Sequence, residues 1–220
     1  MYKKIISLEM AIQNKGSTVT ELFKKVDPDN TIIFSDMIGT LIEQGGGSSL
    51  STQHSTALTH YLIGNGKLVV ATSAPIDLVE KIFLTPLNYN GDTPLYIISA
   101  FNSAVYRQKF GQMELYYRIK DHIQDKSEGI EFVHSMGHAC FPKRHNIIFI
   151  GDSEDDIRMF HSSYSYSGRY GFFVGEKQSD YDTIEKHSSL DTFFLRGAGI
   201  SGTLDVLNAI NTPQHLSLGE

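Results

Sequence analysis

Short apolar segments alternate along the chain with segments whose apolar residues recur at helical spacing. The apolar runs are rich in β-branched residues, as is typical of buried parallel strands; they cover residues 31–35, 67–73, 95–99, 146–151, 171–175 and 192–195. The helical pattern covers residues 51–63, 75–84, 126–136 and 202–210. This alternation predicts an α/β fold, a doubly wound and largely parallel sheet with helices on both faces.

No internal repeat or linker interrupts the pattern, so we expect a single domain spanning residues 1–220. Apolar residues at helical spacing in 3–13 and 17–26 predict an N-terminal helical extension over residues 1–30. Two strand-like segments around Gly111 predict a small hairpin insertion within about residues 100–125.

Composition narrows the function classes. The chain has 220 residues, of which 40% are hydrophobic, and a formal net charge of -6. This balance gives nucleic-acid binding no electrostatic support. The single cysteine, Cys140, rules out an intramolecular disulfide and favours a reducing, cytoplasmic location, although export by a dedicated secretion system would leave the same signature. No apolar run has the ~18 residues of a membrane span, and no signal peptide is recognised.

Two of the apolar strands end in a carboxylate. Asp36 follows the first strand, and Asp152 follows the strand 146–151, with Asp155 and Asp156 close behind. Ligands bind at the carboxyl ends of strands in open α/β sheets, so these oxygens could hold Mg²⁺ together. The alternatives are a turn-capping role for Asp36 and an acidic first helical turn for 152–156. Three glycines at 45–47 lack the Lys-Ser/Thr of a P-loop, and the histidines show no metal-ligand spacing.

Four ordered segments resemble the motifs of the haloacid dehalogenase (HAD) superfamily. Asp-Met-Ile-Gly-Thr-Leu at 36–41 resembles its first motif, usually Asp-x-Asp-Gly-Thr-Leu. Residues 151–159 resemble its last motif as seen in Cof-type phosphatases, and the strand 69–73 resembles the second motif. Lys126 stands where the lysine of the third motif is expected.

The resemblance implies a role for each matching residue. Asp36 would attack phosphorus and form an aspartyl-phosphate. Thr72, with Ser73 beside it, and Lys126 would bind the phosphate. Asp36, the backbone carbonyl of Ile38 and Asp152, with Asp155 or Asp156, would hold Mg²⁺. The metal ion and Lys126 would then neutralise charge in phosphoryl transfer.

Two departures from the family pattern bear on function. Ile38 replaces the second aspartate of the first motif, which protonates the leaving group and activates water; general acid–base catalysis is worth ~10²–10⁴-fold. The cap domain is minimal or absent, and such an open site suggests either a macromolecular substrate or a partner protein that covers it. The phosphorylated substrate could thus be a small molecule or a macromolecule. We therefore expect a Mg²⁺-dependent phosphatase or phosphotransferase with weak turnover. The alternative is a catalytically inactive HAD-fold binding or regulatory protein that keeps the pocket; a dehalogenase-like hydrolase is disfavoured by the missing cap.

Overall fold

A computed structural model describes residues 12–13, 19–45, 47–99, 104–118, 126, 130, 133, 146–161, 168–188 and 190–212. The described residues form a nine-stranded sheet in the order β1-β9-β8-β7-β2-β3-β4-β5-β6. The strands are β1 (Ile12–Gln13), β2 (Thr31–Ser35), β3 (Lys67–Thr72), β4 (Leu95–Ser99), β5 (Ala104–Lys109), β6 (Gln112–Arg118), β7 (Asn146–Gly151), β8 (Arg169–Phe173) and β9 (Asp191–Phe194).

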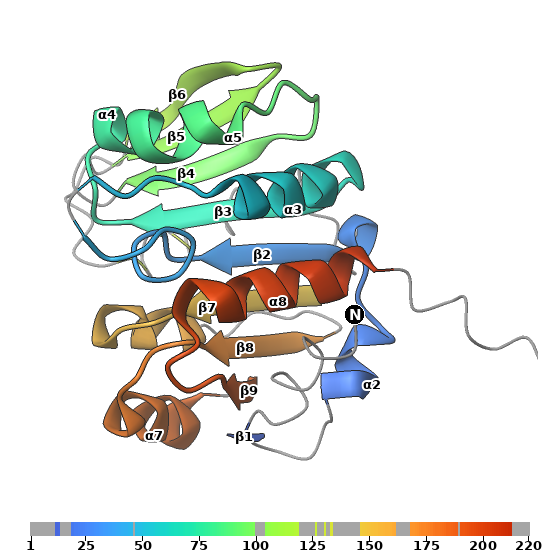
Figure 1. Ribbon diagram of the computed structural model, residues 1–220, viewed down its shortest axis with the longest axis vertical. Helices are drawn as coiled ribbons and strands as arrows, with labels where there is room; N and C mark the ends of the chain where they lie inside the picture. Colours follow the sequence, from blue (N-terminus) through green and yellow to red (C-terminus); the bar gives the residue numbers. More distant parts are fainter. Residues whose placement is uncertain are drawn as a thin grey trace, which may run out of the picture.

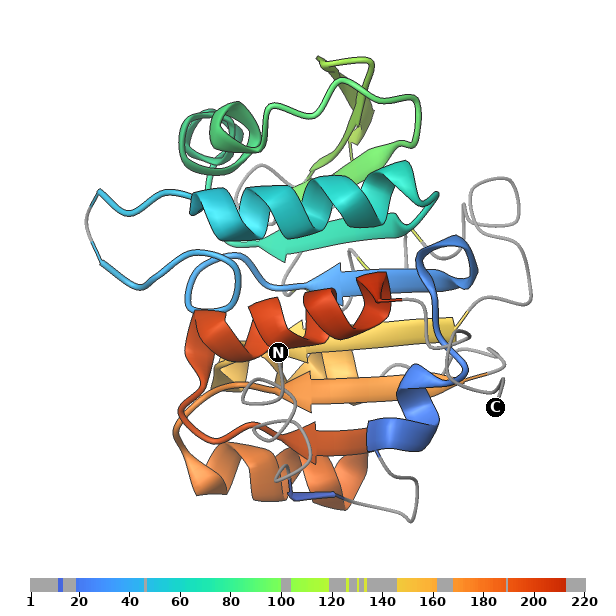
Figure 2. The same cartoon turned by 45° about the vertical axis from the view of Figure 1, so that its right-hand side comes forward.

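Helical elements cover both faces of this sheet (Figures 1 and 2). They are α2 (Val19–Phe23), η1 (Pro28–Asn30), α3 (Thr52–Ile63), α4 (Ile76–Val79), the π-helical η2 (Glu80–Leu84), α5 (Thr85–Leu87), the 3-10 helix η3 (Glu154–His161), α7 (Gln178–His187) and α8 (Gly199–Asn211). The six strands β9, β8, β7, β2, β3 and β4 are parallel, whereas β1, β5 and β6 join antiparallel at the edges. The predicted doubly wound α/β fold is confirmed.

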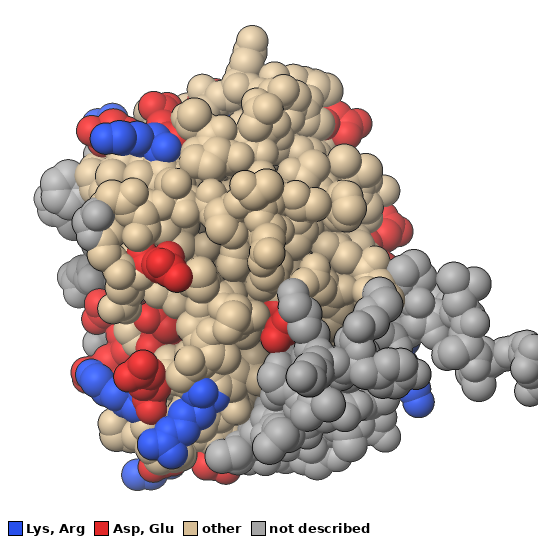
Figure 3. All heavy atoms as spheres, viewed as in Figure 1, with Lys and Arg blue, Asp and Glu red and all other residues tan. Residues whose placement is uncertain are grey.

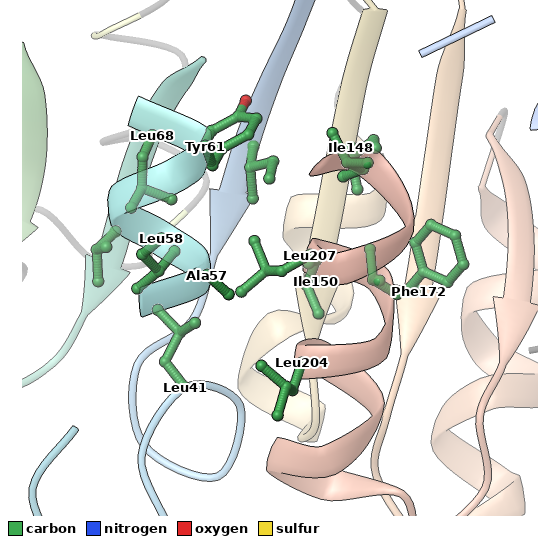
Figure 4. Close-up of a cluster of buried hydrophobic side chains, with 14 of the residues drawn as sticks. Leu41, Ala57, Leu58, Tyr61, Leu68, Ile148, Ile150, Phe172, Leu204 and Leu207 are labelled. Carbon is green, nitrogen blue, oxygen red and sulfur yellow. The ribbon is translucent and has the colours of Figure 1, made fainter. Parts of the chain in front are cut away.

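The two faces of the sheet carry two separate hydrophobic cores. On one face, α3 and α8 lie side by side over the central strands, and Ala57 of α3 faces Leu207 of α8 between them (Figure 4). On the other face, Phe160 of η3 packs against Phe149 of β7, and Tyr181 of α7 stacks on Phe194 of β9. Strands buried on both faces have to be apolar at every position, which explains the continuous runs of the sequence.

The register of the central strands positions the functional edge. Ser35, the last residue of β2, pairs with Ile150 of β7 on one side and with Val70 of β3 on the other. Because parallel strands in register end at the same edge, the residues that follow β2, β3 and β7 leave the sheet together. The described residues place no inserted domain over this edge; β5 and β6 instead extend the sheet sideways.

Some elements differ from the sequence-based expectation. Ile12–Gln13 is a strand paired with β9, within a segment expected to be helical, and most of the expected N-terminal extension lies outside the described residues. Helix α7 was not predicted, because its sequence is mostly polar. Its buried apolar residues are Tyr181 and Ile184, and two such residues do not establish a helical pattern. Lys126, Ile130 and Val133 are helical, as the pattern indicated. None of the described helices combines the length and apolar character that a membrane crossing needs.

Tyr61 of α3 holds the starts of two central strands. Its buried hydroxyl donates to the carbonyl of Thr31 at 2.6 Å, and it lies 3.1 Å from that of Lys67. We predict that Tyr61→Phe lowers the free energy of unfolding by about 1–2 kcal/mol, because strand carbonyls lose their partner. Urea unfolding measures this change. Tyr117→Phe on β6, whose tyrosine is 40% exposed, should change the stability by less than about 0.5 kcal/mol. An equal loss in both variants would contradict the assignment.

Candidate active site

Asp36 leaves the sheet directly after β2. Its backbone N–H donates to the carbonyl of Ile150 at 2.9 Å, so the hydrogen bonding between β2 and β7 continues one residue past the end of β2. The Asp36 residue is only 4% exposed. A carboxylate held this rigidly at the carboxyl edge of a sheet is a candidate for chemistry rather than a solvated turn cap.

Asp152 follows β7 in a tight turn, and Asp156 lies in the first turn of η3. Asp156 is fully buried, and its Oδ2 accepts hydrogen bonds from the backbone N–H groups of Asp152 and Ser153, both at 3.1 Å, and from Ser153 Oγ at 3.0 Å. The side chain of Asp156 folds back so closely over Gly151 that a Cβ there would overlap it. The glycine that ends this strand is therefore required by packing against Asp156.

Lys126 joins the two carboxylates from outside the sheet. Its Nζ donates to Asp36 Oδ1 at 2.5 Å and to Asp156 Oδ1 at 2.6 Å. The lysine residue is 8% exposed and the carboxylates are buried, so all three charges are largely removed from water. A buried charge is tolerated when it is paired and hydrogen-bonded, and this lysine satisfies that condition for both aspartates.

One ammonium group does not neutralise this cluster. Burial, and next the charge of Asp156, raise the pKa of Asp36 to about 7, although the adjacent Lys126 lowers it. Burial and the charge of Asp156 also raise the pKa of Asp152. Burial lowers the pKa of Lys126, but the charges of Asp156 and Asp36 outweigh it and hold that pKa above its ordinary value. The cluster keeps an excess of negative charge that a cation would relieve.

The geometry fits a divalent cation. Asp36, Asp152 and Asp156 each offer a carboxylate oxygen, and these oxygens lie within 4.8 Å of one another. Hard cations such as Mg²⁺ take oxygen ligands at about 2.0–2.1 Å, so oxygens on opposite sides of the ion are about 4 Å apart. The donor set and its spacing therefore suit such an ion.

The remaining predicted residues are placed around this cluster with different degrees of burial. Thr72 is buried at the end of β3, where its Oγ1 accepts from the N–H of Ala74 at 3.1 Å, while Ser73 is exposed. Asp155 is exposed and lies outside the group of three aspartates. Ile38 is 37% exposed beside Asp36, and the contribution of its carbonyl to a metal site stays a prediction.

Two partners of Asp152 were not singled out as site residues from the sequence. Thr40 Oγ1 donates to Asp152 Oδ1, and Gln44 Nε2 donates to Asp152 Oδ2, each at 3.0 Å. The Gly-Thr pair after Asp36 was a usable signal for Thr40. No feature of the sequence indicated Gln44, because its contact with Asp152 depends on the path of the loop after β2.

A cavity of about 710 Å³ opens beside Asp152. Its walls come from the loop after β2, the turn after β7, the start of α7 and the start of α8. Gly39 and Asp152 line the cavity as well, so it adjoins the aspartate cluster directly. A volume of this size is typical of small-molecule sites.

Known structures share this arrangement of strands and helices. Trehalose-6-phosphate phosphatase of Aspergillus fumigatus superimposes with a TM-score of 0.52 at 10% identity, over 84% of this chain and 94% of that chain. A haloacid dehalogenase-like hydrolase of Bacteroides thetaiotaomicron gives a TM-score of 0.51 at 11% identity, over 82% and 98%. The chain has the haloacid dehalogenase-like fold. No family model matches the chain, and neither does any curated protein sequence.

Gly39 provides a test of the aspartate cluster in this HAD-like fold. Its φ is +91°, and a Cβ there would fall on the carboxylate of Asp152. Gly47, with φ +95°, has open space around it. We predict that each Gly→Ala variant loses about 1 kcal/mol from backbone strain. Gly39→Ala alone should also displace Asp152 and weaken divalent-cation affinity roughly 10–100-fold.

Titration calorimetry with Mg²⁺ and with Mn²⁺ measures this affinity, and thermal unfolding measures the strain. Gly47→Ala is the matched control, because it shares the positive φ without the clash. Equal cation affinities in the two variants would show that Asp152 is not a ligand.

Proposed function

We propose that this chain is a Mg²⁺-dependent phosphatase or phosphotransferase in which Asp36 is the nucleophile. The observation that carries the proposal is the buried contact of Lys126 with both Asp36 and Asp156, beside a third carboxylate at cation-binding distance. A lysine and a divalent cation around a strand-end aspartate supply the positive charge that phosphoryl transfer needs.

The chain's own residues would act in order. A carboxylate oxygen of Asp36 attacks phosphorus, the bond to the leaving-group oxygen breaks, and an aspartyl-phosphate forms. Lys126 balances the charge that nucleophile and phosphate bring together, and Thr72 hydrogen-bonds a non-bridging oxygen. Asp36, Asp152 and Asp156 would hold Mg²⁺, which supplies charge neutralisation when bound. Water then cleaves the acyl-phosphate, which restores Asp36 and releases phosphate.

Ile38 determines which steps are slow. An isoleucine side chain neither donates a proton to the leaving group nor accepts one from water. Leaving groups that depart as stable anions should therefore be favoured over alkoxides, and the aspartyl-phosphate should persist because its hydrolysis lacks a general base. We further propose that the chain forms a single domain in the cytoplasm and that a partner protein covers the open edge of its site.

We predict that wild-type protein hydrolyses p-nitrophenyl phosphate slowly with Mg²⁺, and that Ile38→Asp raises kcat by roughly 10²–10⁴-fold. Ile38→Asn is the matched control, because it resembles aspartate in size and polarity but has no titrating group. It should leave kcat near the wild-type value. A rate increase as large in Ile38→Asn would mean that polarity rather than proton transfer limits turnover.

We also predict that Asp36→Asn abolishes the wild-type rate and the covalent intermediate. The intermediate is detected as a mass increase of one phosphoryl group in protein quenched with acid during turnover. Phosphorylation without Asp36 would contradict its role as nucleophile.

The alternative function is a binding protein that keeps the cation and phosphate site without turnover. The observation that favours it is Ile38 itself, a half-exposed apolar side chain in the position of the acid–base residue. In that case wild type binds Mg²⁺ and vanadate, only Ile38→Asp turns over, and no phosphorylated wild-type protein is found. Absence of both cation and vanadate binding would rule out both functions.

A further inference from the structure

The walls of the cavity beside the aspartate cluster have a marked charge. Four carboxylates line it, from Glu43, Asp152, Glu176 and Asp180, against one ammonium, that of Lys177, among the described lining residues. A divalent cation at the cluster would offset Asp152 but leave the other three. Figure 3 shows acidic side chains on this side of the molecule, around α7, with basic side chains interspersed among them.

Asp180 is the most informative of these residues. It lies in the first turn of α7 and is only 8% exposed, yet it lines the cavity. Its Oδ1 accepts a 3.2 Å hydrogen bond from Ser179 Oγ, and within the described part of the chain Oδ2 has no partner. Because Asp180 lines the cavity, a ligand group that carries a hydrogen-bond donor could bind this oxygen.

We propose that this cavity takes the non-phosphate part of the substrate, and that it selects a polyhydroxyl or amino-bearing group over one with a further acidic group. The inference rests on the proposed function, because it places the phosphate at Asp36 and Lys126. The cavity is lined by Gly39 and Asp152, so it adjoins that site on the side of Asp152. Hydroxyl and ammonium groups donate to carboxylates, whereas an added carboxylate or phosphate is repelled by them.

The test uses three glycosyl phosphates that differ in charge on the same ring: glucosamine 1-phosphate, glucose 1-phosphate and glucuronic acid 1-phosphate. At about pH 7 their non-phosphate parts carry a positive, a neutral and a negative charge. Binding is measured by calorimetry on Asp36→Asn with Mg²⁺, and kcat/KM on wild type and Ile38→Asp. We expect affinity and kcat/KM to fall in that order, by roughly tenfold overall, because most of these charges are partly exposed.

Asp180→Asn should reduce the difference in affinity between the first and the last of these compounds to roughly threefold. Binding of glucosamine 1-phosphate should weaken most. Asp182→Asn is the matched control, since Asp182 lies on the same helix, is exposed, and makes the same change in net charge away from the cavity. It should leave the difference in affinity unchanged. The same reduction in both variants would show that net charge alone is responsible and would overturn the role of the cavity.

The outcomes separate this inference from the proposed function. Hydrolysis of p-nitrophenyl phosphate with an equal or reversed preference among the three sugars would overturn the inference and leave the phosphatase standing. The expected order in binding, with no turnover in wild type, would support the inference within the non-catalytic alternative. No binding of any phosphate ester would overturn both.

Discussion

The pairing of one buried ammonium group with two buried carboxylates is the interaction on which this site depends. Lys126 lies at 2.5 Å from Asp36 and 2.6 Å from Asp156, and each charge is tolerated away from water only because the others are present. Asp156 in turn shapes the turn after β7 through three hydrogen bonds to Oδ2. The lysine therefore links the nucleophile candidate to the loop that carries Asp152.

The parallel register of β2 and β7 makes this pairing possible. Asp36 and Asp152 are far apart in the chain, but each follows a strand that ends at the same edge of the sheet. This part of the site was predictable, because an apolar run that stops at a carboxylate is visible in the sequence. The fold was predictable for the same reason, since strands buried on both faces are continuous apolar runs and the segments between them have helical spacing.

Contacts that depend on the paths of loops or on polar helices could not be predicted from the sequence. Helix α7 was not predicted because few of its residues are apolar. Asp180 lines the cavity because the chain after β8 returns to the edge of the sheet where the cavity lies. Gln44 reaches Asp152 by the path of one loop. Asp155 and Asp156 are neighbours that look equivalent in sequence, yet one is exposed and the other is fully buried, because only Asp156 folds back to the N–H groups of the turn.

The proposed phosphoryl transfer has two requirements, and the residues that bear on them lie in different surroundings. Charge neutralisation would come from Lys126 and from a cation held by the aspartates, and Lys126, Asp36 and Asp156 are buried. Proton transfer would have to come from the position of Ile38, which is 37% exposed at an edge where the described residues place no cap. A side chain at an open edge can change without disturbing the buried charges behind it. An isoleucine at this position is therefore compatible with the proposed cation and phosphate site.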